Sequence, residues 1–178
     1  MSKKEELLTN AAKIINEEGM QKLTMQYLAE KSEMTKGGVL YHFESKELLL
    51  LKMNEMVIEE FDEKMSSYKA KLSGPYQFIR AYALATIDIL EDSENVLLPA
   101  VFISSQEAGK SKELWEVVSK KWVKLFIQDD GDQYNILELR MICDGILFSI
   151  MYGYAMQDKE KMKKVVLDYC KRLESEVA

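Results

Sequence analysis

Apolar residues recur at helical spacing along almost the whole of this 178-residue chain, and no segment shows a sustained alternation of apolar and polar residues. Helical spacing gives each segment one face that can be buried, whereas a chain without the two-residue period has no half-buried strands from which to build a sheet. Only two prolines interrupt the pattern. The sequence therefore predicts an all-α protein of about nine helices.

Capping residues and helix breakers place these helices along the chain. Thr24, Thr35 and Ser45 are expected to begin the second, third and fourth helices, and Pro75 to be the first residue of the fifth. Residues 96–103 could form a buried strand, but a short helix beginning near Pro99 is preferred because no partner strand exists. The second and fourth helices are expected over residues 25–31 and 46–71, and the first, seventh, eighth and ninth over about 4–17, 115–126, 136–156 and 160–174.

The charge is distributed unevenly along the chain. The formal net charge is -6, which weighs against a protein that binds nucleic acid over its whole surface. Up to Leu50, however, seven Lys and Arg residues stand against eight Asp and Glu residues, so the excess acid lies beyond that point. With 47% hydrophobic and 30% charged residues the chain can bury a core.

We expect two domains, residues 1–50 and 51–178.

The cysteines and the apolar segments indicate the cellular compartment of the protein. Cys143 and Cys170 are far apart and lie within helical patterns, so neither a disulfide framework nor a metal-binding spacing is expected. The first residues contain no apolar signal, and the longest apolar stretch, residues 146–156, is about half of the roughly 20 residues that span a membrane. We expect a cytoplasmic protein with no metal, no cofactor and no membrane anchor.

Two short helices separated by about three residues, over 25–31 and after Thr35, form a helix-turn-helix pattern. This motif lays its second helix in the major groove of DNA. The side chains between Thr24 and Lys46 suit that task, since hydroxyl groups and helix N-termini dock phosphates while Lys, Gln, Tyr and His supply hydrogen bonds. The expected DNA contacts are Thr24, Gln26, Thr35, Lys36, Gly37, Gly38, Tyr41, His42 and Lys46.

Individual members of this set have both a functional and an ordinary interpretation. Gly37 and Gly38 lack side chains, so their backbone could press against bases or phosphates. Lys46 lies in the first turn of a helix, where its charge is unfavourable unless an anion such as a phosphate is nearby. Tyr41 could be a core residue like Phe43, and a single histidine is more often an ordinary residue than a ligand; their neighbours favour DNA contact.

Residues 7–50 resemble the N-terminal domain of the tetracycline-repressor (TetR) family. The resemblance is carried by Ala11-Ala12, Gly19, Leu23-Thr24-Met25, Leu28-Ala29, Lys36-Gly37 and the run Tyr41-His42-Phe43-x-Ser45-Lys46-Glu47-x-Leu49. Two positions depart from the family pattern. The corner, usually glycine, is Ser32-Glu33-Met34, which predicts a left-handed Glu33 at a cost on the order of 1 kcal/mol. Leu40 stands where tyrosine is common.

The resemblance implies that the rest of the chain dimerises through its last two helices. In residues 136–156, Gly145, Ser149 and Gly153 form a stripe of small residues where another helix could approach. The last helix carries an apolar face made of Met162, Val165, Val166, Tyr169, Cys170 and Leu173. We expect a homodimer on a palindromic duplex; the alternative is that both faces pack only within one subunit.

The resemblance also implies a pocket for a small-molecule inducer. Aromatic and methionine side chains could line such a pocket or fill a core, and the sequence leaves both possibilities open. Asp88, Glu107 and Asp144 lie beside apolar stretches and could favour a cationic ligand, although solvated positions suit them as well. The expected lining residues are Met56, Tyr82, Phe102, Trp115, Trp122, Phe126, Phe148 and Tyr152.

The sequence thus predicts a ligand-released, homodimeric transcriptional repressor. An enzyme is disfavoured because one histidine and two isolated cysteines supply no recognisable nucleophile with a base and no metal site. A DNA-binding protein without a small-molecule switch is the main alternative. A thiol sensor through Cys143 and Cys170 is weaker, because neither lies near a clear activating cation.

Overall fold

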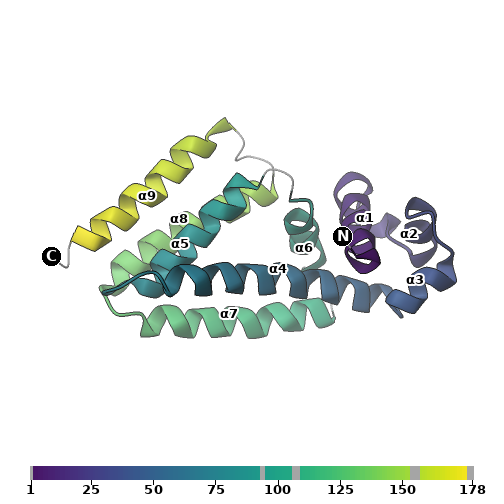
Figure 1. Ribbon diagram of the computed structural model, residues 1–178, viewed down its shortest axis with the longest axis horizontal. Helices are drawn as coiled ribbons and strands as arrows, with labels where there is room; N and C mark the ends of the chain where they lie inside the picture. Colours follow the sequence, from purple (N-terminus) through teal and green to yellow (C-terminus); the bar gives the residue numbers. More distant parts are fainter. Residues whose placement is uncertain (1, 93–94, 106–108, 153–156, 176–178) are drawn as a thin grey trace. The chain divides into compact units, whose positions relative to one another are not determined.

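The computed structural model describes residues 2–92, 95–105, 109–152 and 157–175, and every regular element in these ranges is helical (Figure 1). The predicted all-α class is therefore confirmed. The described helices are α1 (Lys3–Glu18), the 3₁₀ turn η1 (Met20–Lys22), α2 (Met25–Lys31), α3 (Lys36–His42), α4 (Lys46–Lys69), α5 (Gln77–Glu91), α6 (Leu97–Ser105), α7 (Lys110–Gln128), α8 (Gln133–Met151) and α9 (Lys159–Ser175).

The chain divides into two compact units. The first unit comprises Met1–Ile58 and Asn95–Val117, and the second comprises Glu59–Glu94 and Val118–Ala178. The dividing points fall inside α4 and α7, so each of these helices contributes residues to both units. The functional boundary that we expect after residue 50 is a separate matter and stays a prediction.

In the first unit, α1 packs against α2 and α6, and Figure 1 shows α6 beside α1. Gly19 ends α1 with φ 90°, and the hydroxyl oxygen of Ser45 accepts a hydrogen bond from the Leu48 amide at the start of α4 (3.2 Å), as expected. Small residues on α1 and α2 allow close approach of the helices. The fully buried side chains include Leu7, Leu8, Ala11, Ala12, Ile15, Leu28, Ala29, Val39 and Leu49.

Asn54 of α4 forms a buried polar junction in the same unit. Its amide nitrogen donates to the Ser104 hydroxyl of α6 (2.9 Å) and to the Leu50 carbonyl (2.8 Å). Its amide oxygen accepts a hydrogen bond from Trp115 Nε1 of α7 (2.7 Å). Because a buried amide left unpaired costs about 1–3 kcal/mol, these partners define how α4, α6 and the first part of α7 fit together.

In the second unit, α5 packs against α8 and α9, which lie beside it in Figure 1. Eleven of the fifteen residues of α5 are buried. Two ion pairs, Arg80 with Glu174 and Lys163 with Glu91, join α5 to opposite ends of α9. This packing makes α5 the central helix of the second unit.

The start of α5 differs from the prediction. Pro75 is not its first residue, because Tyr76 follows in the left-handed conformation (φ 62°) and the helix begins at Gln77. The Tyr76 amide donates to the Asp130 carbonyl (2.6 Å), and the Tyr76 hydroxyl accepts from the Asp132 amide (3.0 Å). Hydrogen bonds to the loop before α8 thus hold Tyr76 in a conformation that a local sequence signal does not predict.

A carboxylate from the same loop caps α5. The Asp129 oxygens accept hydrogen bonds from the amides of Phe78 (3.0 Å) and Ile79 (2.9 Å), two donors that have no partner within the helix. A negative charge also suits the positive end of the helix dipole. Partial burial of Asp129 raises its pKa, against the effect of these two hydrogen bonds.

Other expectations fall partly outside the described residues. The short helix near Pro99 is confirmed as α6, which Asn95 caps through the amides of Leu97 and Leu98. Glu107, Gly153 and Met156 lie outside the described ranges. Within those ranges, no helix has the length and apolar character needed to cross a membrane, and no cluster of side chains is suited to hold a metal ion.

Candidate nucleic-acid interface

The two helices of the predicted motif are capped by hydroxyl groups, as expected. The Thr24 hydroxyl accepts a hydrogen bond from the Tyr27 amide (3.0 Å) at the start of α2. The Thr35 hydroxyl does the same for the Gly38 amide (3.0 Å) at the start of α3. Both threonines are exposed, so the two capped helix starts lie at the surface of the first unit.

The corner between α2 and α3 has the predicted left-handed residue, since Glu33 has φ 52°. The Met34 amide donates to the Ala29 carbonyl (2.9 Å), which closes the turn. The neighbouring Ser32 is buried, and its hydroxyl accepts a hydrogen bond from the side-chain amide of Asn10 on α1 (3.0 Å). A hydrogen bond to α1 and a turn closed onto α2 therefore hold the corner.

The two glycines of α3 have different surroundings. A Cβ atom at Gly37 would have Thr35 Oγ1 as its nearest neighbour, at 4.0 Å. At Gly38 it would lie 3.1 Å from Met34 Cε and 3.3 Å from Thr35 Oγ1, which is tighter than ordinary contact. Gly37 is thus free of steric constraint within the chain and exposed, whereas the packing of Met34 and the Thr35 cap favours glycine at position 38.

Tyr41 is the most exposed large hydrophobic side chain of the motif, with 86% of its surface accessible. It meets the half-buried His42 ring edge to face, with ring centroids 5.3 Å apart. Phe43 is buried, as its core interpretation predicted. An exposed tyrosine next to exposed Lys36 and Gly37 places polar and aromatic groups on one short helix, which is the composition that a DNA-reading helix needs.

The remaining two expected contacts are held by partners within the chain. Gln26 is exposed on α2, and its amide donates to the Glu30 carboxylate (2.9 Å). The Lys46 ammonium donates to the Met20 carbonyl (2.9 Å). Lys46 therefore has a partner within the chain, and its contact with a phosphate stays a prediction.

Sequence reasoning missed a cluster that positions α2. The Tyr27 hydroxyl donates to both carboxylate oxygens of Glu18 on α1 (3.0 and 2.9 Å), and the Lys31 ammonium lies 3.4 Å from the same carboxylate. Hydrogen bonding from Tyr27 lowers the pKa of Glu18. Lys31 also lies over the Tyr27 ring, 5.2 Å from its centroid. Only the four-residue spacing of Tyr27 and Lys31 was visible in the sequence.

The residues expected to line a ligand pocket are distributed over both units. In the second unit, Tyr82, Trp122 and Phe126 do come together, in an aromatic cluster completed by Phe61 and Phe78. Neighbouring ring centroids in the cluster lie 5.0 to 6.1 Å apart. Such distances are those of aromatic rings in contact, so this part of the set packs as core.

The other five expected pocket residues do not join that cluster. Met56, Phe102 and Trp115 belong to the first unit, where Trp115 is engaged with Asn54. Phe148 and Tyr152 are 48% and 49% exposed, and their rings are tilted by 35° to each other with centroids 4.5 Å apart. The structure thus places this pair on the surface of α8, at the end of the helix.

The two acidic residues considered as partners of a cationic ligand accept tyrosine hydroxyl groups. Tyr68 donates to Asp88 (2.8 Å) and Tyr82 donates to Asp144 (2.6 Å). Burial and the adjacent Asp144 carboxylate raise the pKa of Tyr82, so it stays a neutral donor. These hydrogen bonds give both carboxylates a structural role.

Neither cysteine has the surroundings of a reactive thiol. Cys143 and Cys170 are both free and buried. Burial raises the pKa of the Cys143 thiol well above its ordinary value and raises that of Cys170 to about 11. Both side chains are therefore protonated at neutral pH, and the thiolate that redox chemistry requires is disfavoured.

The geometry of α2, the corner and α3 defines a helix-turn-helix DNA-binding domain, carried by an all-helical protein. Residues 7–53 match the family described as bacterial regulatory proteins, tetR family. This match assigns residues 7–53, which contain the helix-turn-helix, to the N-terminal domain of TetR-family regulators. Among curated proteins, none matches the chain.

Solved structures share the fold over nearly the whole chain. AibR, crystallised with isovaleryl coenzyme A and operator DNA, is 19% identical, with a TM-score of 0.70 over 93% of this chain and 96% of its own. PfmR, a TetR family transcriptional regulator from Thermus thermophilus, is 14% identical (TM-score 0.66; 97% and 96% covered). NalD, the secondary repressor of the MexAB-OprM multidrug efflux pump in Pseudomonas aeruginosa, is 18% identical (TM-score 0.63; 95% and 94% covered).

The left-handed Glu33 makes a testable contribution to stability. Replacing Glu33 with glycine removes the Cβ that disfavours this conformation, so we expect the free energy of unfolding to rise by about 1 kcal/mol. Chemical denaturation followed by circular dichroism measures the change. Glu33→Ala is the matched control, because it removes the carboxylate but keeps the Cβ. An equal gain in both variants would show that charge, and not backbone strain, is responsible.

Proposed function

We propose that this protein is a sequence-specific transcriptional repressor that binds a palindromic operator in the cytoplasm as a homodimer and is released from DNA by a small molecule. The observation that carries the proposal is that Lys36, Gly37 and Tyr41 of α3 are all exposed after a capped helix start. These three residues are exposed, so the core of the first unit does not depend on them.

The contacts can be assigned roles by their chemistry. Lys36 has the reach and charge for a guanine edge or a phosphate, and Tyr41 offers a hydroxyl donor to a phosphate. Thr24 and Thr35 bring helix N-termini to the backbone of the duplex. The excess of acidic residues elsewhere in the chain repels DNA, so the attraction to DNA must come from the exposed residues of α2 and α3.

Binding measurements test these roles. After selection of bound duplexes from a random pool, the winning duplex is titrated with the protein at several salt concentrations. We expect Lys36→Ala and Tyr41→Phe each to weaken binding to the duplex. If the side chain reads a base edge, the binding free energy should fall by roughly 1–3 kcal/mol. If it contacts a phosphate, the slope of log affinity against log salt concentration should become smaller by about one. Lys171→Ala, which removes an exposed charge on α9, is the control. If the wild type and the three variants bind the duplex with equal affinity, the assignment of Lys36 and Tyr41 as DNA contacts is contradicted.

The homodimer is supported by a second apolar face on α8. Ile136, Leu139, Cys143 and Ile146 are buried within the second unit. A helix turns about 100° per residue, so the opposite face is a separate stripe that runs for roughly 27 Å. This α8 stripe consists of five side chains that are between 48% and 79% exposed: Tyr134, Leu137, Met141, Phe148 and Tyr152.

A small residue interrupts the α8 stripe, as a close helix contact requires. A Cβ atom at Gly145 would meet nothing within 4 Å, so no neighbour in the described part of the subunit explains this glycine. We propose that α9 contributes less to the dimer interface than its sequence predicts. Four residues of its apolar face, Val166, Tyr169, Cys170 and Leu173, are already buried inside the second unit, and Val165 is 51% exposed. A two-fold dimer centred on α8 would cover the stripe.

The dimer is tested by introducing a charge at the centre of the stripe. Met141 is 66% exposed, so Met141→Lys fits the isolated subunit but places an ammonium group in the proposed interface. We expect sedimentation equilibrium to show at least a tenfold weaker dimer. Val117→Lys, at a 67% exposed apolar position of the first unit, serves as the control. A dimer that tolerates Met141→Lys would refute pairing through α8.

The small-molecule switch is supported by AibR, whose structure contains isovaleryl coenzyme A together with operator DNA. A ligand that prefers one arrangement of α4, which contributes to both units, would change operator affinity by its differential binding, typically 1–3 kcal/mol. The contacts among Tyr82, Trp122 and Phe126 favour the alternative, a DNA-binding protein controlled by a partner.

A ligand screen distinguishes a repressor released by a small molecule from a DNA-binding protein controlled by a partner. We expect at least one compound to raise the melting temperature of the protein and to lower its affinity for the selected duplex at least fivefold, measured by fluorescence anisotropy. Titration of the duplex without compound is the control. Compounds that bind but leave operator affinity unchanged would favour the protein without a small-molecule switch.

A further inference from the structure

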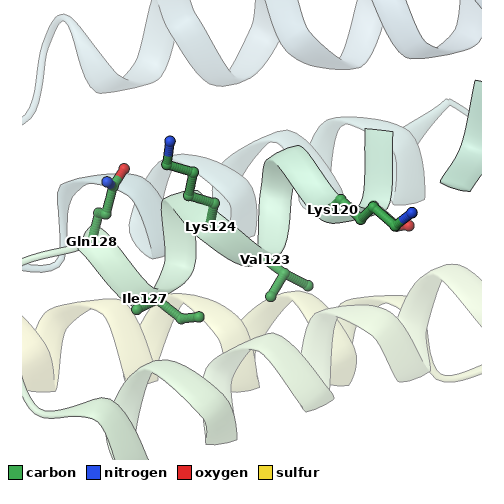
Figure 2. Close-up of a pocket in the computed structure, with 6 residues that line it drawn as sticks. Lys120, Val123, Lys124, Ile127 and Gln128 are labelled. Carbon is green, nitrogen blue, oxygen red and sulfur yellow. The ribbon is translucent and has the colours of Figure 1, made fainter. Parts of the chain in front are cut away.

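The second half of α7 exposes apolar side chains that the fold of the second unit does not use. Val123 is 39% exposed and Ile127 is 67% exposed, while Phe126 next to them is buried in the aromatic cluster. Figure 2 shows Val123 and Ile127 on one side of α7 and the side chains of Lys124 and Gln128 on the other. This helix therefore has one face for the core and one apolar face that is exposed to solvent.

Val123 and Ile127 belong to two adjoining grooves. One lies on α7 itself, lined also by Lys120 and Lys124. The other, of about 290 Å³, lies between α7 and α8, and Tyr134 and Leu137 line it. Because Tyr134 and Leu137 are the first two residues of the α8 stripe, the exposed face of α7 is continuous with the surface that the proposed homodimer covers.

The charges along the two helices are complementary. Lys120 and Lys124 are exposed on α7 beside the first groove. Glu138 and Asp144 are exposed on α8 and flank the stripe, and within the subunit they pair with Arg172 and Arg140. A two-fold axis that pairs the α8 stripes would bring α7 of one subunit toward α8 of the other, where these opposite charges attract.

We propose that α7 is part of the homodimer interface and that the groove between α7 and α8 receives an apolar side chain from a second copy of this chain. The inference rests on the proposed homodimer and extends it from α8 to the face formed by Val123 and Ile127. A side chain seated in the groove removes Ile127 and Leu137 from water, and Lys120 and Lys124 form the polar rim.

The same helix then touches both the interface and the aromatic cluster. Trp122 and Phe126 contact Tyr82 in the cluster, and each is adjacent in sequence to an interface residue, Val123 or Ile127. A rearrangement of these rings would therefore move the interface face of α7. This is a direct route by which a change inside the second unit alters the pairing of two subunits.

The test compares lysine substitutions at two positions of α7 that are equally exposed. Ile127 lies in the groove, and Val117 lies outside it in the first unit; each is 67% exposed. We expect Ile127→Lys to weaken the dimer at least tenfold in sedimentation equilibrium and Val117→Lys to leave it unchanged. Circular dichroism verifies that both variants are folded.

The outcomes separate this inference from the homodimer itself. If Met141→Lys dissociates the dimer but Ile127→Lys does not, α7 lies outside the interface, and the inference is overturned while the homodimer stands. A monomeric wild-type protein overturns both.

Cysteine accessibility provides a second measurement that does not depend on a disruptive substitution. Maleimide labelling of Ile127→Cys should slow at least fivefold as the protein concentration is raised through the dimer dissociation constant, whereas labelling of Val117→Cys should not. The two native cysteines are buried, so they contribute little background. Labelling of Ile127→Cys at a rate independent of concentration in a dimerising protein would overturn the inference.

Discussion

The DNA-binding domain depends on the burial of one face of α1. Helices of seven residues such as α2 and α3 are too short to be stable alone in water, because each must nucleate a turn before it gains cooperative hydrogen bonds. They form here because Leu28, Ala29 and Val39 are buried, with α2 packed against both α1 and α3. The exposed side of α3 is thereby free to carry residues suited to contact with DNA, since stability comes from the opposite side.

Local signals predicted the structure where local interactions decide it. The Thr24 and Thr35 caps follow from residues within three or four positions, whereas the left-handed Glu33 was predicted from the corner of the family pattern. The start of α5 could not be predicted in this way, because Tyr76 is held by Asp130 and Asp132, which are more than fifty residues away in the sequence. Hydrogen bonds between distant segments leave no periodic pattern to recognise.

In the candidate DNA-binding site, too, local features were predicted from the sequence and contacts between distant segments were not. The exposure of Tyr41 and Lys36 agrees with their predicted roles, which stay predictions until DNA binding is measured. The carbonyl partner of Lys46 and the cluster of Glu18, Tyr27 and Lys31 depend on how α1, η1, α2 and α4 pack. The aromatic residues illustrate a further limit, because sequence spacing cannot distinguish rings that line a cavity from rings that fill it.

On α8 the two opposite apolar faces connect the fold to the proposed function. One face completes the core with α5, and the other is exposed at the surface of the subunit. A second copy that covers the exposed face would also bring two α3 helices into a symmetric arrangement. Symmetry doubles the number of bases read and thereby supplies the specificity that one seven-residue helix lacks.

Hydroxyl-radical footprinting on a selected duplex tests this account most directly. Two symmetric recognition helices should protect two equivalent patches, with centres about one helical turn, roughly 34 Å, or a multiple of it apart, on a sequence with two-fold symmetry. A single protected patch on an asymmetric sequence would contradict the account, because it would show that one α3 helix binds without a symmetry-related partner.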